Sequence, residues 1–374
     1  MMKKDWEIKK LKDICEKGSS NVNMKDLGKL EGDFPIYGAS GFIQNVNFYH
    51  QEKEYIGIIK DGSGIGRTML LPAKSSVIGT LQYILPKEGN SIHFINYALQ
   101  SLDLSKYKQG AAIPHIYFRD YGETELVVPP LEEQKRIVKI LNEKFAQLET
   151  IKTNAQTNLQ NAKDLFQSQL AKAFSNTTWE KAKLEDIALD FSRGKSKHRP
   201  RNDKCLFGGN YPFIQTGDIR NADKYVTDYS ETYNETGLTQ SKLWPEGTLC
   251  ITIAANIAET AILSFPCCFP DSVIGFIPNE KRTTVDFVYY LIQFFKSELQ
   301  KLSKGAAQDN LNLAKFENMN FPLPPLSEQK RIVKELAALS EKVRQLQEIY
   351  TKQIANCAEL KQAYLQKAFE GELD

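Results

Sequence analysis

Residues 129–141 read PPLEEQKRIVKIL and residues 324–336 read PPLSEQKRIVKEL, so one motif occurs twice at an offset of 195. The same offset continues on both sides of the motif, relating 110–112 to 305–307 and 173–174 to 368–369. A period this long exceeds the 20–50 residues typical of solenoid repeats. The chain therefore contains a duplicated module.

The duplication extends upstream in a looser form. Trp6-Glu7 opens the first half and Trp179-Glu180 opens the second, at an offset of 173. The second half must therefore gain about 22 residues before its Gly-Ala-Ala. Between these points the halves diverge, although residues 76–79 resemble residues 272–275. This pattern predicts a constant frame around a variable insert.

A long helix is predicted after each Pro-Pro-Leu. A Pro-Pro pair cannot lie inside a helix but can immediately precede one. No glycine or proline then occurs up to about residue 174 or about residue 370. We expect helices over 131–175 and 326–374, with uninterrupted stretches of about 44 residues and about 66 Å.

The two predicted helices carry apolar side chains at coiled-coil spacing. In the second helix, one row has residues seven apart, namely Leu336, Val343, Tyr350, Cys357 and Tyr364. An alternate row contains Leu339, Leu346, Gln353 and Leu360. The first helix has a less regular row of Leu141, Phe145, Leu148, Ile151, Ala155, Leu159, Ala162, Phe166, Leu170 and Ala173. An intramolecular antiparallel pair would satisfy both rows, and the alternative is two helices folded back on their own domains.

The segments 1–130 and 176–325 are predicted to be mixed α/β domains. Residues 55–59 and 249–253 are apolar runs typical of strands. Residues 93–104 and 285–302 have helical patterns. The predicted fold class is therefore α+β, with two such domains, two long helices forming an antiparallel coiled coil, and a pseudo-two-fold internal repeat.

Composition favours a reduced, cytosolic protein. The net charge is only +2, and six scattered cysteines include no CxxC pair. A disulfide framework or a zinc-ligand spacing is therefore not indicated, and no metal site is expected. The N-terminal residues have no apolar signal-peptide core. Residues 61–67 read DGSGIGR, which matches neither phosphate-loop pattern and favours a glycine turn. No catalytic constellation is found.

The most concentrated charge lies in residues 193–204, where six Lys or Arg residues accompany one acid. Glycine, proline and serines indicate a loop, and a cationic loop can displace counterions from DNA phosphates. The candidate DNA-binding residues here are Arg193, Lys195, Lys197, His198, Arg199 and Arg201. A solvated surface loop without a ligand is the alternative.

Other candidate DNA-binding residues are dispersed. The first domain offers Lys60, Arg67, Lys106, Lys108, Gln109, His115, Tyr117 and Arg119. The second adds Gln215, Asn256, Lys304, Gln308 and Asn310. Arg and Lys can contact guanine, and Asn and Gln can contact adenine, in the major groove. His115 and Tyr117 fit equally well in a core or beside phosphates.

Taken together, these motifs resemble the specificity subunit of type I restriction–modification systems. The doubled PPLxEQKRIV, the terminal residues 365–373 (LQKAFEGEL) and the basic loop continuing into residues 211–219 carry the resemblance, which covers essentially the whole chain. It implies two target-recognition domains, each reading one half of a split DNA site, and helices that set the spacer and dock two modification subunits.

The resemblance also implies a division of chemistry among subunits. This chain would be non-catalytic and would bind no cofactor. The modification subunits would bind S-adenosylmethionine and methylate adenine, and restriction subunits would add ATP- and Mg-dependent translocation and cleavage. Two alternatives stay open: a coiled-coil scaffold whose inserts bind protein, and an enzyme in its own right, which the missing motifs disfavour.

Overall fold

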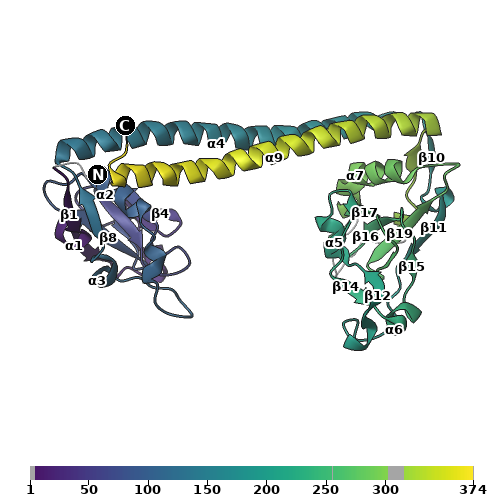
Figure 1. Ribbon diagram of the computed structural model, residues 1–374, viewed down its shortest axis with the longest axis horizontal. Helices are drawn as coiled ribbons and strands as arrows, with labels where there is room; N and C mark the ends of the chain where they lie inside the picture. The colour runs from purple at the N-terminus through teal and green to yellow at the C-terminus, as the bar shows by residue number, and fades with distance from the viewer. Residues whose placement is uncertain (1–4, 255, 302–315, 374) are drawn as a thin grey trace. The chain divides into compact units, whose positions relative to one another are not determined.

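The computed structural model describes residues 5–254, 256–301 and 316–373. The chain forms two compact units, residues 1–157 with 350–374 (unit 1) and residues 158–349 (unit 2). Helix α4 (Leu131–Ala173) and helix α9 (Leu326–Glu370) are each divided between the two units, so that both units contain a part of both helices. Both helices, which Figure 1 labels, begin directly after a Pro-Pro pair in the sequence, as predicted. The two units are defined by contacts in space, and their limits fall inside the long helices. They therefore do not test the predicted domain boundaries at 130, 175 and 325, which remain predictions.

Unit 1 contains three sheets, one of which is only the strand pair β1-β9, and a small helical layer. Its remaining elements are β1 (Glu7–Lys10), α1 (Leu11–Ile14), β2 (Cys15–Ser19), η1 (Met24–Lys29), β3 (Phe34–Gly38), β4 (Gly41–Val46), β5 (Tyr55–Ile59), β6 (Thr68–Leu71), β7 (Ser76–Val77), β8 (Leu81–Pro86), α2 (Ile92–Ser101), η2 (Leu104–Tyr107), α3 (Phe118–Tyr121) and β9 (Glu125–Val128). The main sheet has the order β2-β8-β5-β6, and a smaller one has the order β4-β3-β7. The predicted strand at 55–59 is confirmed as β5.

Unit 2 repeats this plan with more strands. Its remaining elements are β10 (Glu180–Ala182), η3 (Glu185–Ile187), β11 (Ala188–Arg193), η4 (Lys204–Leu206), β12 (Phe207–Phe213), α5 (Thr216–Asn221), β13 (Tyr225–Val226), β14 (Glu231–Tyr233), α6 (Glu235–Thr239), β15 (Leu243–Trp244), β16 (Leu249–Thr252), β17 (Thr260–Leu263), β18 (Cys267–Cys268), β19 (Val273–Pro278), α7 (Val285–Lys301) and β20 (Phe321–Leu323). The main sheet, β11-β19-β16-β17-β13, has the strand order of unit 1 with β13 added at one edge. A second sheet has the order β14-β12-β18-β15, and β10 pairs with β20.

Strand register locates the extra residues of the second half. Ser19 and Arg193 hold equivalent positions in the two main sheets and are 174 residues apart. Ile59 and Thr252 are also equivalent, but they are 193 residues apart. The insertion therefore lies between β11 and β16, in the stretch that includes the basic loop. The likeness of residues 76–79 to residues 272–275 does not mark equivalent positions, because β7 belongs to the smaller sheet whereas β19 belongs to the main one.

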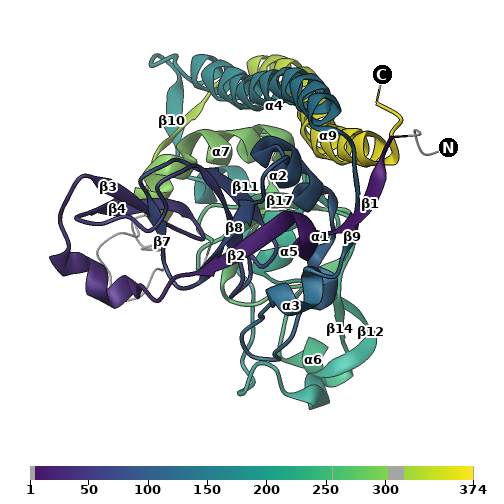
Figure 2. The same ribbon diagram turned by 90° about the vertical axis from the view of Figure 1, so that its left-hand side faces the viewer.

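In each unit a short helix lies between the main sheet and the long helices. In unit 1 the buried face of α2 packs with Ile56 and Ile84 of the sheet and with Leu141 of α4. Figure 2 shows α2 of unit 1 between β8 and the two long helices. In unit 2, α7 packs with Ile251 of the sheet and Leu170 of α4. These contacts fix each sheet to the helix pair through apolar burial.

The long helices pair antiparallel within each unit, so the alternative of separate helices is wrong. In unit 1 the first part of α4 shares a core with the last part of α9, through Leu141 and Leu365. In unit 2 the last part of α4 shares a core with the first part of α9, through Leu170 and Leu336. Both units therefore contain the predicted antiparallel coiled coil, and the internal repeat is confirmed (Figure 1).

The buried seam differs in detail from the predicted rows. In α9, Leu346 and Leu360 of the alternate row are exposed, so this row is wrong. The α4 seam is more regular than expected, because its buried positions Leu141, Leu148, Ala155 and Ala162 stand seven apart. Exposed Ile151 lies outside it. Hydrophobicity in the sequence did not distinguish the positions buried between the two helices from the exposed positions beside them, because both sets carry apolar side chains.

Candidate nucleic-acid interface

The loops that carry the predicted contacts in unit 2 meet at one end of its main sheet. Arg193, at the end of β11, pairs with the start of β19, and Thr252, at the end of β16, pairs with the same start. The loops 194–203 and 269–272 and the described residues between β16 and β17, 253–254 and 256–259, therefore emerge at the same sheet end. Backbone hydrogen bonds join them, from Gly194 to Val273 at 2.9 Å and from Ile253 to Ser272 at 3.0 Å.

The basic segment is a loop, as predicted, and the backbone near its start is held by side chains from elsewhere in unit 2. The amides of Lys197 and His198 both donate to Gln240 Oε1, at 2.7 and 3.1 Å. Ser241 Oγ donates to the carbonyl of Lys195 at 3.0 Å. The side chains of Lys195 and Lys197 remain exposed. Fixing the backbone while the cationic side chains stay exposed reduces the ordering cost of binding a polyanion.

Gly194 permits this arrangement because of its size. A Cβ at this position would lie 2.3 Å from the carbonyl oxygen of Phe269 and 2.5 Å from that of Pro270. Such distances are incompatible with any side chain. The glycine therefore lets the start of the basic loop pass against the segment that leads into β19.

Part of the positive charge of the basic loop is balanced by an acidic residue that lies far away in the sequence. The guanidinium of Arg201 lies 2.8 Å from the carboxylate of Asp271, and that of Arg199 lies 4.0 Å from it. Arg193 donates to the backbone carbonyl of Asp271 at 2.7 Å. Local composition could not reveal this acid, because it comes from a segment about 70 residues away. The ion pairs are solvent-exposed and contribute little stability, so the arginines can exchange partners.

The corresponding sheet end of unit 1 gathers several of its predicted contacts. Lys60 follows β5, and its Nζ lies 3.0 Å from Asp61. The other oxygen of Asp61 contacts His115 Nδ1 at 2.7 Å. Backbone hydrogen bonds of 2.8 Å in both directions join His115 to Gln109. Asp61 was not among the predicted residues. It links Lys60 to His115, and the second of these contacts joins residues that are 54 positions apart in the sequence.

Aromatic and cationic side chains continue this surface. The ring of Tyr117 stacks near that of His115, with centroids 6.4 Å apart, and the guanidinium of Arg119 lies 4.8 Å from the Tyr117 centroid. Tyr117 is exposed and His115 is only partly buried, so neither belongs to the core. Stacked aromatic and guanidinium groups are suited to bases and phosphates.

The remaining predicted residues are spread over both units or lie outside the described residues. Arg67 ends the 60–67 turn, and its carbonyl accepts from the amide of Ile59 at 3.0 Å, so it lies at the same sheet end as Lys60. Lys106 lies in η2 and Lys108 directly follows it, and both are exposed. Gln215 Nε2 donates to Glu231 at 2.8 Å, beside an acidic pocket. Asn256 lies in the 253–259 loop, at the same sheet end as the basic loop. Lys304, Gln308 and Asn310 lie outside the described residues.

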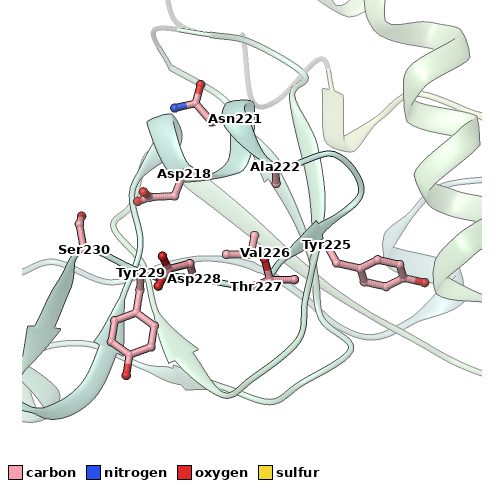
Figure 3. A pocket seen from close by; sticks show the side chains of 9 residues that line it. All are labelled: Asp218, Asn221, Ala222, Tyr225, Val226, Thr227, Asp228, Tyr229 and Ser230. Atoms are coloured by element: carbon pink, nitrogen blue, oxygen red, sulfur yellow. The ribbon is translucent and has the colours of Figure 1, made fainter. Parts of the chain in front are cut away.

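A surface pocket in unit 2 is unsuited to phosphate. It is lined by residues of α5, β13 and the loop after β13, including the carboxylates of Asp218 and Asp228, which Figure 3 shows on its wall. Among the described residues that line this pocket, none carries a positive charge. Carboxylates repel phosphate oxygens. Contacts with the phosphates of DNA are therefore expected at the basic loop and not at this pocket.

A group that sequence patterns missed lies at the end of the basic loop. His198 Nε2 is 3.0 Å from an oxygen of Asp203, whose other oxygen accepts from the backbone amide of Cys205 at 3.1 Å. The Cys205 amide and His198 lower the pKa of Asp203 to about 2. Asp203 in turn raises the pKa of the Cys205 thiol. The relevant signal was the spacing His-x4-Asp-x-Cys.

Comparison with known proteins defines the class. The profile of the family described as "Type I restriction modification DNA specificity domain" matches residues 3–159 and 176–354. The chain belongs to this family, and it is a DNA-recognition subunit of a type I restriction–modification system. The expected family, fold class and function are thereby confirmed, and nothing supports the scaffold alternative.

Two curated relatives and two solved structures illustrate the likeness. The MjaVIII specificity subunit of Methanocaldococcus jannaschii is 26% identical, with 90% of this chain and 86% of that protein aligned. The putative MjaX specificity subunit from the same organism is 24% identical, with 90% and 87% aligned. A chain from a structure of complex assembly and conformational transition of the type I R-M system gives a TM-score of 0.81 at 20% identity over 100% of both chains. The HsdS subunit from Thermoanaerobacter tengcongensis gives 0.58 at 20% identity, over 99% and 98%. Both structural likenesses concern the fold.

Within residues 5–254, 256–301 and 316–373, every helix is too short or too polar to span a bilayer.

Proposed function

We propose that each unit contacts one half of a split DNA site through the same end of its main sheet. The observation that supports this is the equivalence of the two sheet ends. The turn after β5 carries Lys60 and adjoins His115, and the loop after β16 carries Asn256 and adjoins the basic loop. Two small readers that must bind together multiply specificity, because each alone covers few base pairs.

Modification profiling with the assembled complex tests this assignment. In unit 1, His115→Ala with Arg119→Ala should relax base preference in one half of the recognised site only. In unit 2, Asn256→Ala with Arg201→Ala should relax the other half only. Lys139→Gln, on an exposed face of α4, is the control and should leave both halves unchanged. Relaxation of both halves by either pair would contradict the proposal.

The long helices are proposed to set the spacing between the half-sites and to dock two modification subunits. Support comes from the continuity of α4 over 43 residues and α9 over 45 residues. Inserting one helical turn into α4 is expected to lengthen the recognised spacer, and sequencing of modified sites measures it. An unchanged spacer would count against this role.

The chemistry is proposed to lie on the partner subunits. On this proposal the present chain is non-catalytic, the modification subunits bind S-adenosylmethionine, and restriction subunits use ATP and Mg²⁺. The complex is placed in the cytoplasm, which agrees with six free cysteines in the structure, because cytosolic thiols stay reduced. Co-purification should recover two modification subunits per chain; a stable complex with only one would contradict that stoichiometry.

A further inference from the structure

Three different metal-ligand side chains converge where the basic loop of unit 2 enters η4. The potential ligand atoms of His198, Asp203 and Cys205 all lie within 4.8 Å of one another. Nε2 of His198 is 3.0 Å from Asp203 Oδ2 and 4.0 Å from the sulfur of Cys205. The cluster combines nitrogen, oxygen and sulfur donors, so it differs from the exposed acidic pairs common on surfaces.

The backbone around the cluster is held on both sides. The amide of His198 donates to Gln240 Oε1 at 3.1 Å. At the other side, Asp203 Oδ1 caps η4 by accepting from Cys205 N, and Asn234 Nδ2 donates to the Cys205 carbonyl at 3.0 Å. The cap occupies Oδ1, so Oδ2 can serve as a ligand without loss of the helix start. Gln240 and Asn234, which lie outside the cluster, therefore hold the backbone at His198 and at Cys205, and the cap of η4 holds Asp203 against Cys205.

We propose that His198, Asp203 and Cys205 form a binding site for a borderline-soft divalent cation of the zinc type. Zinc takes Cys, His and Asp ligands in tetrahedral geometry. Its usual bond lengths place tetrahedral N and O ligands about 3.4 Å apart, and N and S ligands about 3.6 Å apart. The observed 3.0 and 4.0 Å bracket these separations. The third pair, the Asp203 oxygen and the Cys205 sulfur, lies within 4.8 Å against about 3.6 Å in a tetrahedral zinc site, so shifts of up to about 1 Å complete the site. Water supplies the fourth ligand.

The charges balance despite the basic surroundings. The cation binds neutral His198 through Nε2, the carboxylate of Asp203 and the thiolate of Cys205, which gives a net charge of zero for the loaded site. The thiol proton passes to solvent, and the imidazole proton resides on Nδ1; nothing is oxidised or reduced. Metal binding of this kind releases a proton because the ligand must be deprotonated.

The cation would close the segment 198–205, which carries Arg199 and Arg201, into a ring. Restricting this segment before DNA arrives lowers the ordering cost of phosphate contacts. This consequence rests on the proposed DNA contact, whereas the metal site itself does not. The two are separable because metal binding is measured without DNA.

Cobalt titration of the full-length, tag-free and metal-depleted chain tests the site. One equivalent of Co²⁺ should give the visible bands of a tetrahedral site and a thiolate-to-cobalt charge-transfer band, both abolished by one equivalent of Zn²⁺. Cys205→Ser should remove the charge-transfer band, and Cys205→Ser and His198→Asn should each weaken Zn²⁺ binding at least tenfold. Cys205 is exposed, so its substitution leaves the core intact, which circular dichroism verifies.

His93→Asn is the matched control. His93 Nε2 lies 4.0 Å from Glu54 and is similarly exposed, but this pair has no thiol beside it. The variant should bind Co²⁺ and Zn²⁺ as the parent does. Absence of the charge-transfer band in the parent, or its persistence in Cys205→Ser, would overturn the site. If zinc binds as described but leaves DNA affinity and its salt dependence unchanged, the metal site stands and the effect on the basic loop is refuted.

Discussion

Gln329 Oε1 accepts a hydrogen bond from the hydroxyl of Thr283 at 2.9 Å, and both side chains are fully buried. The amide nitrogen of Gln329 donates to the carbonyls of Pro324 and Arg282, each at 2.9 Å. This one side chain joins the Pro-Pro corner and the start of α9 to the turn that begins α7.

The first half contains the same joint. Gln134 accepts from the amide of Ser91, the N-cap of α2, at 2.8 Å, and donates to the carbonyl of Pro129 at 2.9 Å. The repeated glutamine of PPLxEQ therefore anchors each long helix to the short helix beneath it. The glutamine therefore occurs in both copies of the motif because it holds the helices in place, and not because it recognises bases.

Gln329→Ala is expected to destabilise unit 2 by about 2–4 kcal/mol, because it leaves a buried hydroxyl and two carbonyls without their partner. Urea unfolding followed by circular dichroism measures the change. Gln345→Ala, on an exposed position of the same helix, is the control and should shift stability by less than about 0.5 kcal/mol. Equal effects of the two substitutions would refute the joint.

The seam of α4 can be tested with two leucine-sized residues one turn apart. Leu148 is 9% exposed and Ile151 is 39% exposed. Leu148→Ala should cost about 2–3 kcal/mol of unfolding free energy, and Ile151→Ala should cost less than about 1 kcal/mol. If Ile151→Ala proves the more damaging, the seam lies on the other face.

Two glycines of unit 2 give opposite expectations. Gly194→Ala should destabilise the unit and displace the basic loop, because the new methyl group would overlap two backbone carbonyls. Gly217→Ala lies within α5, where the new methyl group would meet open space, and it should be neutral or stabilising by up to about 1 kcal/mol. Thermal unfolding and DNA binding distinguish them. A tolerated Gly194→Ala with unchanged DNA affinity would contradict the close approach.

The basic loop is expected to contact phosphates through its exposed lysines. Arg193 and Arg199 also bind backbone carbonyls, so Lys195→Gln with Lys197→Gln is the cleaner test. Each lost phosphate contact should reduce the slope of log affinity against log salt by about 0.9, so the pair should reduce it by about 1.8. Binding titrations over a range of salt measure the slope.

Base preference should be unchanged in that lysine pair, because phosphate contacts carry no sequence information. Lys330→Gln with Lys334→Gln, on exposed positions of α9, removes the same charge elsewhere in unit 2. If this control flattens the slope equally, the effect is one of net charge and not of the loop.

Alkaline pH should destabilise both units. Burial raises the pKa of Cys15 in unit 1 and of Tyr289 in unit 2 to about 12, from ordinary values of 9.0 and 10.0. The unfolded chain loses these protons first, so stability declines as pH rises from about 9 towards 12. Cys15→Ala should flatten this decline for unit 1, as measured by urea unfolding at several pH values. A decline that begins below pH 8 would point to other groups.

Local pattern predicted the frame of this protein well. The Pro-Pro pairs, the absence of helix breakers and the seven-residue spacing placed both long helices within a few residues of their bounds, and β5 and β16 were recognised as apolar runs. These features depend on neighbours along the chain. The seam was less predictable, because Ile151 and Leu360 are as apolar as the buried positions and only their exposure separates them.

The sequence by itself determined the duplication, the helices and the loop character of the basic segment. Only the tertiary structure decided which loops share a sheet end, that Asp271 pairs with Arg201, and that His198, Asp203 and Cys205 converge. Helical and turn preferences act over a few residues, whereas strand order is selected by the burial of apolar surface between distant segments. The geometry of the interface depends on the strand order, and therefore on contacts between segments that are distant in the sequence.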